Sequence, residues 1–283
     1  MSLPLKFRIV NVFAESVLTG NPLCVFEDGR ELDGATMQAL ALQFNLSETT
    51  FVLPANDASA VRRVRIFTPA FEMPFAGHPT LGSAHVVREL AECGDHLKLQ
   101  VQAGIIPVDA IGDVWTLQAN APTWHAPGLA RAQYAQMLGI ADEDVLAGAL
   151  WVDTGAEQLI VPLATAGAVE RCSPSAELLA RYSVGAKRRG LVYVWSRIDD
   201  ERIRVRFFFD KRGSIVEDPG TGSACANLGG WFIAHADPLP LTAIVLQGDQ
   251  LGRPCRLGLR VDASKRIFVS GRVIEIGRGT IQL

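Results

Sequence analysis

The sequence predicts a mixed α+β fold that consists of two similar halves. Three landmarks recur in the same order: a Thr-Gly turn that leads into a strand, a strand that begins Arg-Val-Arg, and a Val-Asp-Ala segment before a further strand. The first residues of these landmarks are Thr19, Arg63 and Val108 in the first half, and Thr154, Arg204 and Val261 in the second. Three landmarks in register indicate an internal duplication. We therefore expect an N-terminal domain of residues 1–120 and a C-terminal domain of residues 130–272, with the last strand, near 273–283, packing back on the first domain.

Local periodicities support this division. Apolar residues recur at helical spacing from Met37 to Phe44, and the pattern stops at Asn45, a residue that tolerates the left-handed cap position. The segment TTFVLP that follows predicts a strand. In the second half, AELLARYSVGAKRRGLVYVW predicts a helix that ends near Gly185 and a strand that begins at Leu191. Residues 118–128 contain two prolines and no periodicity, which predicts a linker.

A glycine-rich loop is predicted before the long helix of each half. FAGHPTLGSA, residues 75–84, precedes an apolar helical stripe that stops at Gly94, and DPGTGSA, residues 218–224, precedes an apolar run that ends at a proline. Helix N-termini expose unpaired N–H groups and about half a positive charge, so two of them facing one ligand are expected to hold a carboxylate. The alternative is that the glycines only shape tight turns.

Composition excludes several classes of partner. The 283 residues are 48% apolar, enough for two ordinary cores, and a net charge of -3 offers no electrostatic footprint for nucleic acid or an anionic membrane. The N-terminus predicts a strand and no run approaches a membrane helix, so we expect a cytoplasmic protein. The five cysteines are scattered and never form C-x-x-C, which predicts reduced, buried thiols without a disulfide framework or zinc site.

Cofactor motifs are also missing. GTGSACANLGG places its third glycine wrongly for a dinucleotide fingerprint, and no Gly-Lys-Ser/Thr of a phosphate loop follows. His78 and His85 lack the H-E-x-x-H pattern, and the other histidines are scattered. We therefore expect neither a metal ion nor a cofactor.

The acidic residues differ between the halves. Glu48 lies where the first helix gives way to a strand, and the matching position near Arg189 or Gly190 has no acid. Glu-Asp-Pro, residues 217–219, precedes the second glycine loop, where the first half has Pro-Phe-Ala. A carboxylate from each half is then expected to serve one cleft. The alternative for Glu48 is the last position of a capping box that begins at Asn45.

The segments GNPLCVF, SETTF, FAGHPTLGSA and EDPGTGSA, in this order between Gly20 and Ala224, resemble the PhzF-like isomerases. These relatives of phenazine biosynthesis enzymes share the diaminopimelate epimerase fold, and the resemblance covers essentially the whole chain. It implies two similar domains, each a β-barrel around a central helix, with one active site between them. It also implies a homodimer and a cofactor-independent isomerase that moves a proton on a small carboxylate-bearing substrate. The best-defined candidate substrate is trans-2,3-dihydro-3-hydroxyanthranilate.

The resemblance also assigns site residues. Glu48 is expected to move the proton, and His78, Asp218 and Ser223 complete the catalytic set. His78 can donate or accept a proton near neutral pH, and Ser223, at a helix start, can cap the helix and reach a ligand. The implied substrate-binding residues are Asn21, Gly77, Gly220, Thr221, Gly222, Gly155 and Gln158.

Two other functions stay open at this point. In the wider epimerase fold a cysteine begins each glycine loop and the two thiols exchange protons with one carbon, whereas Ala76 and Pro219 stand there in this sequence. This counts against an amino-acid epimerase or racemase, and the retained acids count against a catalytically silent binding protein. These assignments depend on aligning the loops through Gly77 and Gly220, and an alignment through Pro79 and Pro219 is the alternative.

Overall fold

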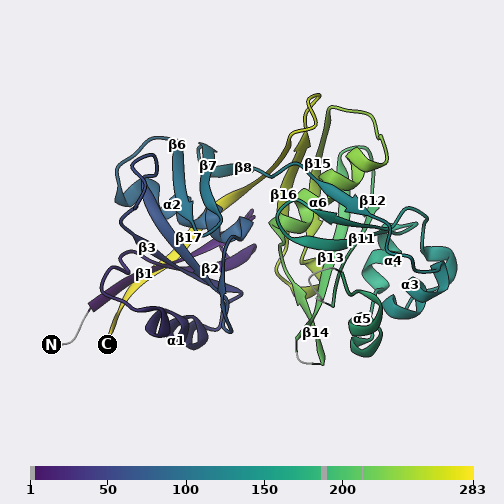
Figure 1. Ribbon diagram of the computed structural model, residues 1–283, viewed down its shortest axis with the longest axis horizontal. Helices are drawn as coiled ribbons and strands as arrows, with labels where there is room; N and C mark the ends of the chain where they lie inside the picture. The colour runs from purple at the N-terminus through teal and green to yellow at the C-terminus, as the bar shows by residue number, and fades with distance from the viewer. Residues whose placement is uncertain (1–3, 186–189, 212) are drawn as a thin grey trace. The chain divides into compact units, whose positions relative to one another are not determined.

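The computed structural model describes residues 4–185, 190–211 and 213–283, which form two compact units (Figure 1). Unit 1 consists of the chain up to Gln118 together with Ser270–Leu283, and unit 2 of Ala119–Val269. The chain passes between the units after Gln118 and again within the long strand β17 (Ile267–Gln282). Among the described residues, no helix is long and apolar enough to cross a membrane.

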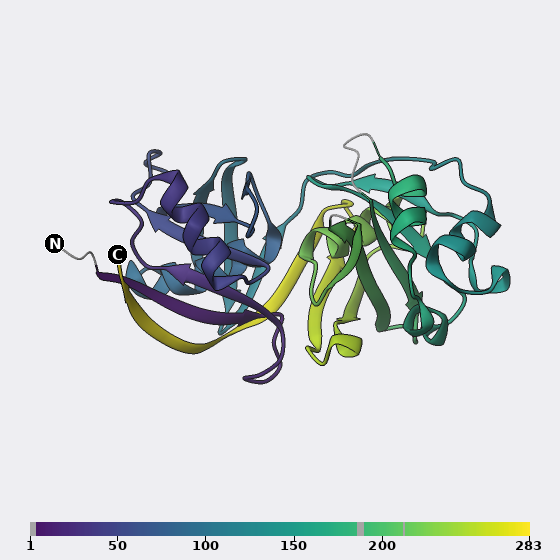
Figure 2. The same ribbon diagram turned by 90° about the horizontal axis from the view of Figure 1, so that it is seen from below.

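Unit 1 is a closed barrel around one helix. Its elements are β1 (Pro4–Val12), β2 (Asn21–Phe26), α1 (Gly34–Phe44), β3 (Glu48–Leu53), β4 (Arg62–Phe67), β5 (Glu72–Met73), α2 (Gly77–Leu90), β6 (His96–Val101), β7 (Gly104–Ile111) and β8 (Val114–Gln118). Successive pairings run β1–β2–β3–β4–β6–β7–β8, and β17 closes the ring by pairing with both β8 and β1. Figure 2 shows the end of β17, in yellow, running beside β1, in purple. Closing the ring leaves no free sheet edge between β8 and β1. Helix α2 fills the barrel, and α1 covers β3 and β4 from outside over a core rich in phenylalanine.

Unit 2 also wraps a barrel-like sheet around one central helix and has additional helices. Its elements are β9 (Thr123–His125), α3 (Arg131–Leu138), η1 (Asp142–Asp144), β10 (Leu150–Asp153), β11 (Glu157–Pro162), α4 (Ala166–Arg171), α5 (Ala176–Tyr182), β12 (Leu191–Arg197), β13 (Arg202–Lys211), β14 (Ser214–Asp218), α6 (Gly222–Ala234), β15 (Leu241–Gln247), η2 (Asp249–Leu251), β16 (Cys255–Val261) and the start of β17. Helix α6 packs on β9, β10, β11 and β16 and is almost wholly buried (Figure 1). The fold is thus mixed α+β, with a barrel-like sheet around a central helix, as the sequence predicts.

The strand pairings follow the same order in both units. In unit 1, β2–β3 and β4–β6 are parallel and β3–β4, β4–β5 and β6–β7 antiparallel; in unit 2, β11–β12 and β13–β15 are parallel and β12–β13, β13–β14 and β15–β16 antiparallel. Ile66 of β4 pairs with Met73 of β5, and Phe207 of β13 pairs with Asp218 of β14. Ile66 and Phe207 are counterparts because each directly follows Arg-Val-Arg. Met73 therefore corresponds to Asp218.

This correspondence corrects the alignment of the glycine segments. Helix α2 begins at Gly77, four residues after Met73, and α6 begins at Gly222, four residues after Asp218. Gly77 thus matches Gly222, so the expected match to Gly220 is wrong, as is the alternative through Pro79 and Pro219. The counterpart of Ala76 is Thr221, and the counterpart of Glu-Asp-Pro is Glu-Met-Pro at residues 72–74.

Other local predictions meet mixed outcomes. Helix α1 ends at Phe44, and Asn45 has the predicted left-handed conformation, with φ of 50°. FAGHPTLGSA is not a loop before a helix, because α2 already begins at Gly77; a proline in the first turn is compatible with that start. The helix stops at Leu90, short of Gly94.

Two predictions in unit 2 also need correction. Residues 118–128 are not simply a linker, since β9 (Thr123–His125) pairs there with β10. Helix α5 ends at Tyr182, before the expected Gly185, although β12 begins at Leu191 as predicted.

An arginine–glutamate pair occupies the same place in each unit. Arg65 of β4 donates through Nε and Nη2 to the two carboxylate oxygens of Glu72, each at 2.7 Å. Arg206 of β13 donates in the same way to Glu217, at 3.0 and 2.7 Å. The side chains are 27% and 29% exposed in the first pair but only 10% and 8% in the second. Each pair fastens the short strand that leads into the central helix.

These matched pairs predict different costs for the same substitution. Arg206→Gln leaves Glu217 charged and buried, so we expect the free energy of unfolding to fall by about 3–5 kcal/mol. Arg65→Gln leaves Glu72 with access to water, so we expect a loss of about 1 kcal/mol or less. Urea unfolding of both variants measures this difference. Equal losses would show that burial does not set the strength of the pair.

Candidate active site

The first group of predicted site residues lies at one end of the barrel in unit 1. Glu48 is the first residue of β3, and His78 is the second residue of α2. Their side chains are 15% and 6% exposed, and His78 Nε2 lies 3.3 Å from Glu48 Oε2. Buried Asn21 begins β2, whose parallel pairing sets Leu23 beside Glu48. Asn21, Glu48 and the start of α2 at Gly77 therefore gather at the same end of β2 and β3.

The charge state of His78 follows from its burial. Loss of water lowers the pKa of His78 from 6.5 to about 3, so the imidazole is neutral at physiological pH. The expectation that His78 donates or accepts near neutral pH therefore applies to a neutral ring. A neutral imidazole still offers one N–H donor and one nitrogen acceptor.

Glu48 has no acidic counterpart in unit 2. Thr50 pairs with Ile66, and Tyr193 pairs with Phe207, the counterpart of Ile66, so Thr50 corresponds to Tyr193. Glu48, two residues before Thr50, therefore corresponds to Leu191. Of the positions expected from the sequence, Arg189 lies outside the described residues and Gly190 directly precedes Leu191. A capping box is also excluded, because Glu48 belongs to a strand and the preceding helix ends at Phe44.

The second group surrounds the turn into α6 in unit 2. The Thr221 hydroxyl donates to Asp218 Oδ2 at 2.5 Å, and Gln247 Nε2 donates to Thr221 Oγ1 at 3.0 Å. The Gln247 amide also joins the main chain at both residues, donating to the Asp218 carbonyl at 2.8 Å and accepting from the Thr221 N–H at 3.2 Å. Gln247 thus ties the turn to β15.

Ser223 does not cap α6. The N-cap residue is Thr221, whose side chain makes no capping bond, and Ser223 is the second helical residue. Its Oγ instead accepts a hydrogen bond from Gln158 Nε2 at 2.9 Å. Gly220 and Gly222 are buried beside this turn. Gly155 lies on an exposed turn with φ of 132°, where its N–H donates to Asp153.

Sequence reasoning misses three features of this site. Gln247 and Asn227 are single polar residues in apolar segments, and no motif points to either of them. Glu217 is the third, because its carboxylate binds Arg206 and so belongs to the framework of unit 2. Asp218 is the acid of that segment whose side chain faces the turn.

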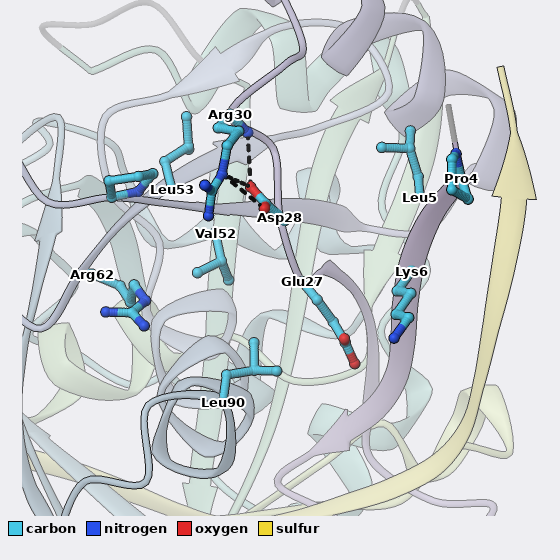
Figure 3. Close-up of a pocket in the computed structure, with 11 residues that line it drawn as sticks. Pro4, Leu5, Lys6, Glu27, Asp28, Arg30, Val52, Leu53, Arg62 and Leu90 are labelled. Carbon is cyan, nitrogen blue, oxygen red and sulfur yellow. Dashed lines mark hydrogen bonds and ion pairs between the residues drawn. The ribbon is translucent and has the colours of Figure 1, made fainter. Parts of the chain in front are cut away.

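A pocket elsewhere in unit 1 contains none of the predicted site residues. It is lined by Pro4, Leu5, Lys6, Glu27, Asp28, Arg30, Val52, Leu53, Pro54, Arg62 and Leu90 (Figure 3). Arg30 Nε donates to Asp28 there at 3.0 Å, and Glu27 accepts from Arg8 at 2.7 Å. Much of its charge is therefore already paired. Within the described part of the chain, no group of three His, Cys, Asp or Glu residues is placed to hold a metal ion.

Comparisons with known proteins agree with this architecture. An uncharacterised isomerase of Pasteurella multocida is 39% identical over 292 residues, spanning 99% of this chain and 95% of the relative. The trans-2,3-dihydro-3-hydroxyanthranilate isomerase of Pseudomonas chlororaphis is 34% identical over 296 residues, spanning 98% and 99%. The crystal structure of a PhzF-family phenazine biosynthesis protein from Bacillus anthracis shares the fold, with a TM-score of 0.87 at 22% identity over 99% of this chain and 100% of that one.

The family comparison covers nearly the whole molecule. The model of the phenazine biosynthesis-like proteins, PhzC-PhzF, matches residues 10–279 and so includes the site residues of both units. Together with the barrel-like sheets around central helices and the similarity to curated isomerases, this match identifies the family. The chain belongs to the PhzC-PhzF family of phenazine biosynthesis-like proteins.

Proposed function

We propose that this protein is a cofactor-independent isomerase that moves a proton between two carbons of a small carboxylate-bearing substrate. The observation that carries the proposal is the Glu48 carboxylate 3.3 Å from the neutral imidazole of His78, at the first turn of α2. The relative from Pseudomonas chlororaphis is named for trans-2,3-dihydro-3-hydroxyanthranilate. That compound, or a related one, is the substrate we propose.

In this mechanism Glu48 carries the proton. The Glu48 carboxylate takes a proton from one carbon and returns it to another, so the composition of the substrate does not change. His78 Nε2 is positioned beside the carboxylate, and a neutral imidazole can donate to charge that develops on the substrate. Asp218 is less suited to this role, because a hydrogen bond from Thr221 at 2.5 Å stabilises its charged form.

The remaining predicted residues are proposed to bind the substrate. Main-chain N–H groups at a helix start are proposed to hold the substrate carboxylate, since such N–H groups lack helical partners. Gly77 begins α2 in unit 1, and Gly222 begins α6 in unit 2. Ser223, Thr221 and Asn21 lie near these helix starts in their own units and would add polar contacts. Gly155 is assigned a contact only through the family resemblance.

The thiols count against the rival epimerase mechanism. Burial raises the pKa of Cys172 to about 12, and also raises the pKa of Cys24, Cys225 and Cys255. A neutral, buried thiol is a poor proton acceptor. We further propose a cytoplasmic location, where thiols stay reduced, and a homodimer, which sedimentation velocity would test.

The first functional test replaces the proposed proton carrier. Glu48→Gln keeps the shape of the side chain and removes its titrating group. We expect turnover of trans-2,3-dihydro-3-hydroxyanthranilate, and deuterium uptake into it from heavy water, to fall by roughly 10²–10⁴-fold while substrate binding persists.

The control is Asp218→Asn, which removes the charge that accepts from Thr221. This variant is expected to weaken binding and turnover together. If Glu48→Gln kept near-normal exchange while Asp218→Asn abolished it without loss of binding, the two roles would be reversed.

Chemical modification tests the thiol mechanism. Because four of the cysteines are buried and Cys93 is partly buried, brief treatment with iodoacetamide is expected to leave turnover intact as long as the protein stays folded. Stoichiometric loss of activity on alkylation of one cysteine, with unchanged circular dichroism, would favour a thiol-based epimerase.

The burial of His78 also predicts a pH dependence of stability. The unfolded chain takes up a proton at His78 near pH 6.5, whereas the folded protein does so only near pH 3. The free energy of unfolding is therefore unaffected by the titration of His78 above pH 6.5. It decreases as the pH falls from 6.5 toward 3, by up to about 1.4 kcal/mol per pH unit. His78→Asn should flatten this slope. Exposed His96, whose pKa is raised by Asp109, is the control: His96→Asn should not flatten the slope.

A further inference from the structure

A chain of buried hydrogen bonds in unit 2 has a fixed direction. It starts at Asn227 of α6, whose Oδ1 accepts from the Thr154 main-chain N–H at 2.9 Å and from Thr154 Oγ1 at 2.7 Å. At the other end of the same amide, Nδ2 donates to the carbonyl of Ala156 at 2.7 Å. A main-chain N–H can only donate and a carbonyl can only accept, so chemistry alone assigns the two ends of the Asn227 amide.

That assignment carries over to Gln158. Asn227 Nδ2 also donates to Gln158 at 2.7 Å, so the atom of Gln158 that faces it must be the acceptor, Oε1. The opposite end of the Gln158 amide, Nε2, then donates to Ser223 Oγ at 2.9 Å. Both amide side chains are buried, Asn227 completely and Gln158 to within 4%. Neither amide can turn over without leaving a buried donor facing a donor.

The direction ends at the hydroxyl of Ser223. Its oxygen already accepts from Gln158, so its hydrogen is left to donate elsewhere. Across the described ranges, 4–185, 190–211 and 213–283, the Ser223 hydroxyl has no other side-chain bond. We propose that Asn227 and Gln158 are positioning residues that orient Ser223 as a hydrogen-bond donor toward the substrate and thereby select an acceptor such as a carboxylate. The proposal rests on the proposed role of Ser223 in substrate binding.

Unit 1 shows that the fold does not require this amide pair. Val25 pairs with Thr50, and Ile160 pairs with Tyr193, the counterpart of Thr50, so Val25 corresponds to Ile160. Two residues earlier in each strand, Leu23 corresponds to Gln158.

Counted from the starts of the central helices, Gly82 likewise corresponds to Asn227. In unit 1 this place holds a close apolar contact, since a Cβ added to Gly82 would lie 2.6 Å from Leu23 Cδ2. Burying two amides instead is favourable only if every polar atom finds a partner. Their presence in unit 2 alone points to a role in orienting Ser223.

The test measures selectivity between two probes. We would use 3-hydroxyanthranilate, a stable aromatic carboxylate, and its carboxamide, which differs in offering an N–H₂ donor. Wild-type protein is expected to bind the carboxylate more tightly. In Gln158→Glu the new carboxylate accepts from both Asn227 and Ser223, so the Ser223 hydrogen turns away from the probe. The ratio of the two dissociation constants, measured by calorimetry at one pH and ionic strength, should shift toward the carboxamide by roughly tenfold or more.

A matched background separates orientation from charge. Gln158→Glu also adds a negative charge, which would disfavour a carboxylate directly. If the effect passes through the Ser223 hydroxyl, most of the shift should vanish when Gln158→Glu is made in Ser223→Ala protein. A shift of equal size in that background would overturn the proposal.

A second measurement needs neither a variant nor a ligand. Neutron diffraction from deuterium-exchanged wild-type crystals locates the deuterium on Ser223 Oγ and those on the two amides. We expect the Ser223 deuterium to point away from Gln158, and a deuterium directed at a Gln158 oxygen would refute the inferred orientation. If neither probe bound, the proposed function would lose support while the neutron map still decided the orientation.

Discussion

An arginine of a central strand and a glutamate of the short strand after it form paired hydrogen bonds at the same place in both units, directly before each central helix. Glu217 is fixed by Arg206, and the next residue, Asp218, begins the turn that ends at Gly222. In unit 1, Arg65 and Glu72 hold the same position relative to α2. Because only a few residues separate each glutamate from its helix, the pair fixes where the free N–H groups of the first turn emerge. The residues of the first helical turn, among them His78 and Ser223, are positioned in this way.

Local signals account for the features that the sequence predicts well. The left-handed cap at Asn45 depends on residues within one turn, and the strands around Glu48 and Leu191 follow from short apolar runs. The glycine segments mislead because glycine disfavours helices in isolation. A helix enclosed by the sheet needs small residues at its close contacts. A Cβ added to Gly229 would lie 2.9 Å from Ile267, and one added to Gly82 would lie 2.6 Å from Leu23. Packing overrides propensity there, and that packing involves strands far away in the sequence.

The sequence predicts which residues form the site more completely than it predicts their protonation states and hydrogen bonds. Motifs supply Glu48 and His78, yet the neutral state of His78 follows from its burial. Gln247 and Asn227 are single polar residues in apolar segments, and their hydrogen-bond partners are distant in the sequence. Thr221 lies 26 residues from Gln247, and Gln158 lies 69 residues from Asn227. Only the folded sheet brings them together. Once it does, the identity of each donor and acceptor follows from elementary hydrogen-bond chemistry.

Strand β17 has a consequence for the order of events during synthesis. Its first residues belong to unit 2, whereas the stretch from Ser270 onward closes the ring of unit 1 between β8 and β1. A nascent chain therefore presents all of Ala119–Val269 before the strand that closes the earlier barrel has been made. Unit 2 can mature as a continuous stretch, while β1 and β8 wait with unpaired edges. During that interval the unpaired edges of β1 and β8 can pair with strands of other chains, so a nascent polypeptide is most prone to aggregation through unit 1, which is synthesised first.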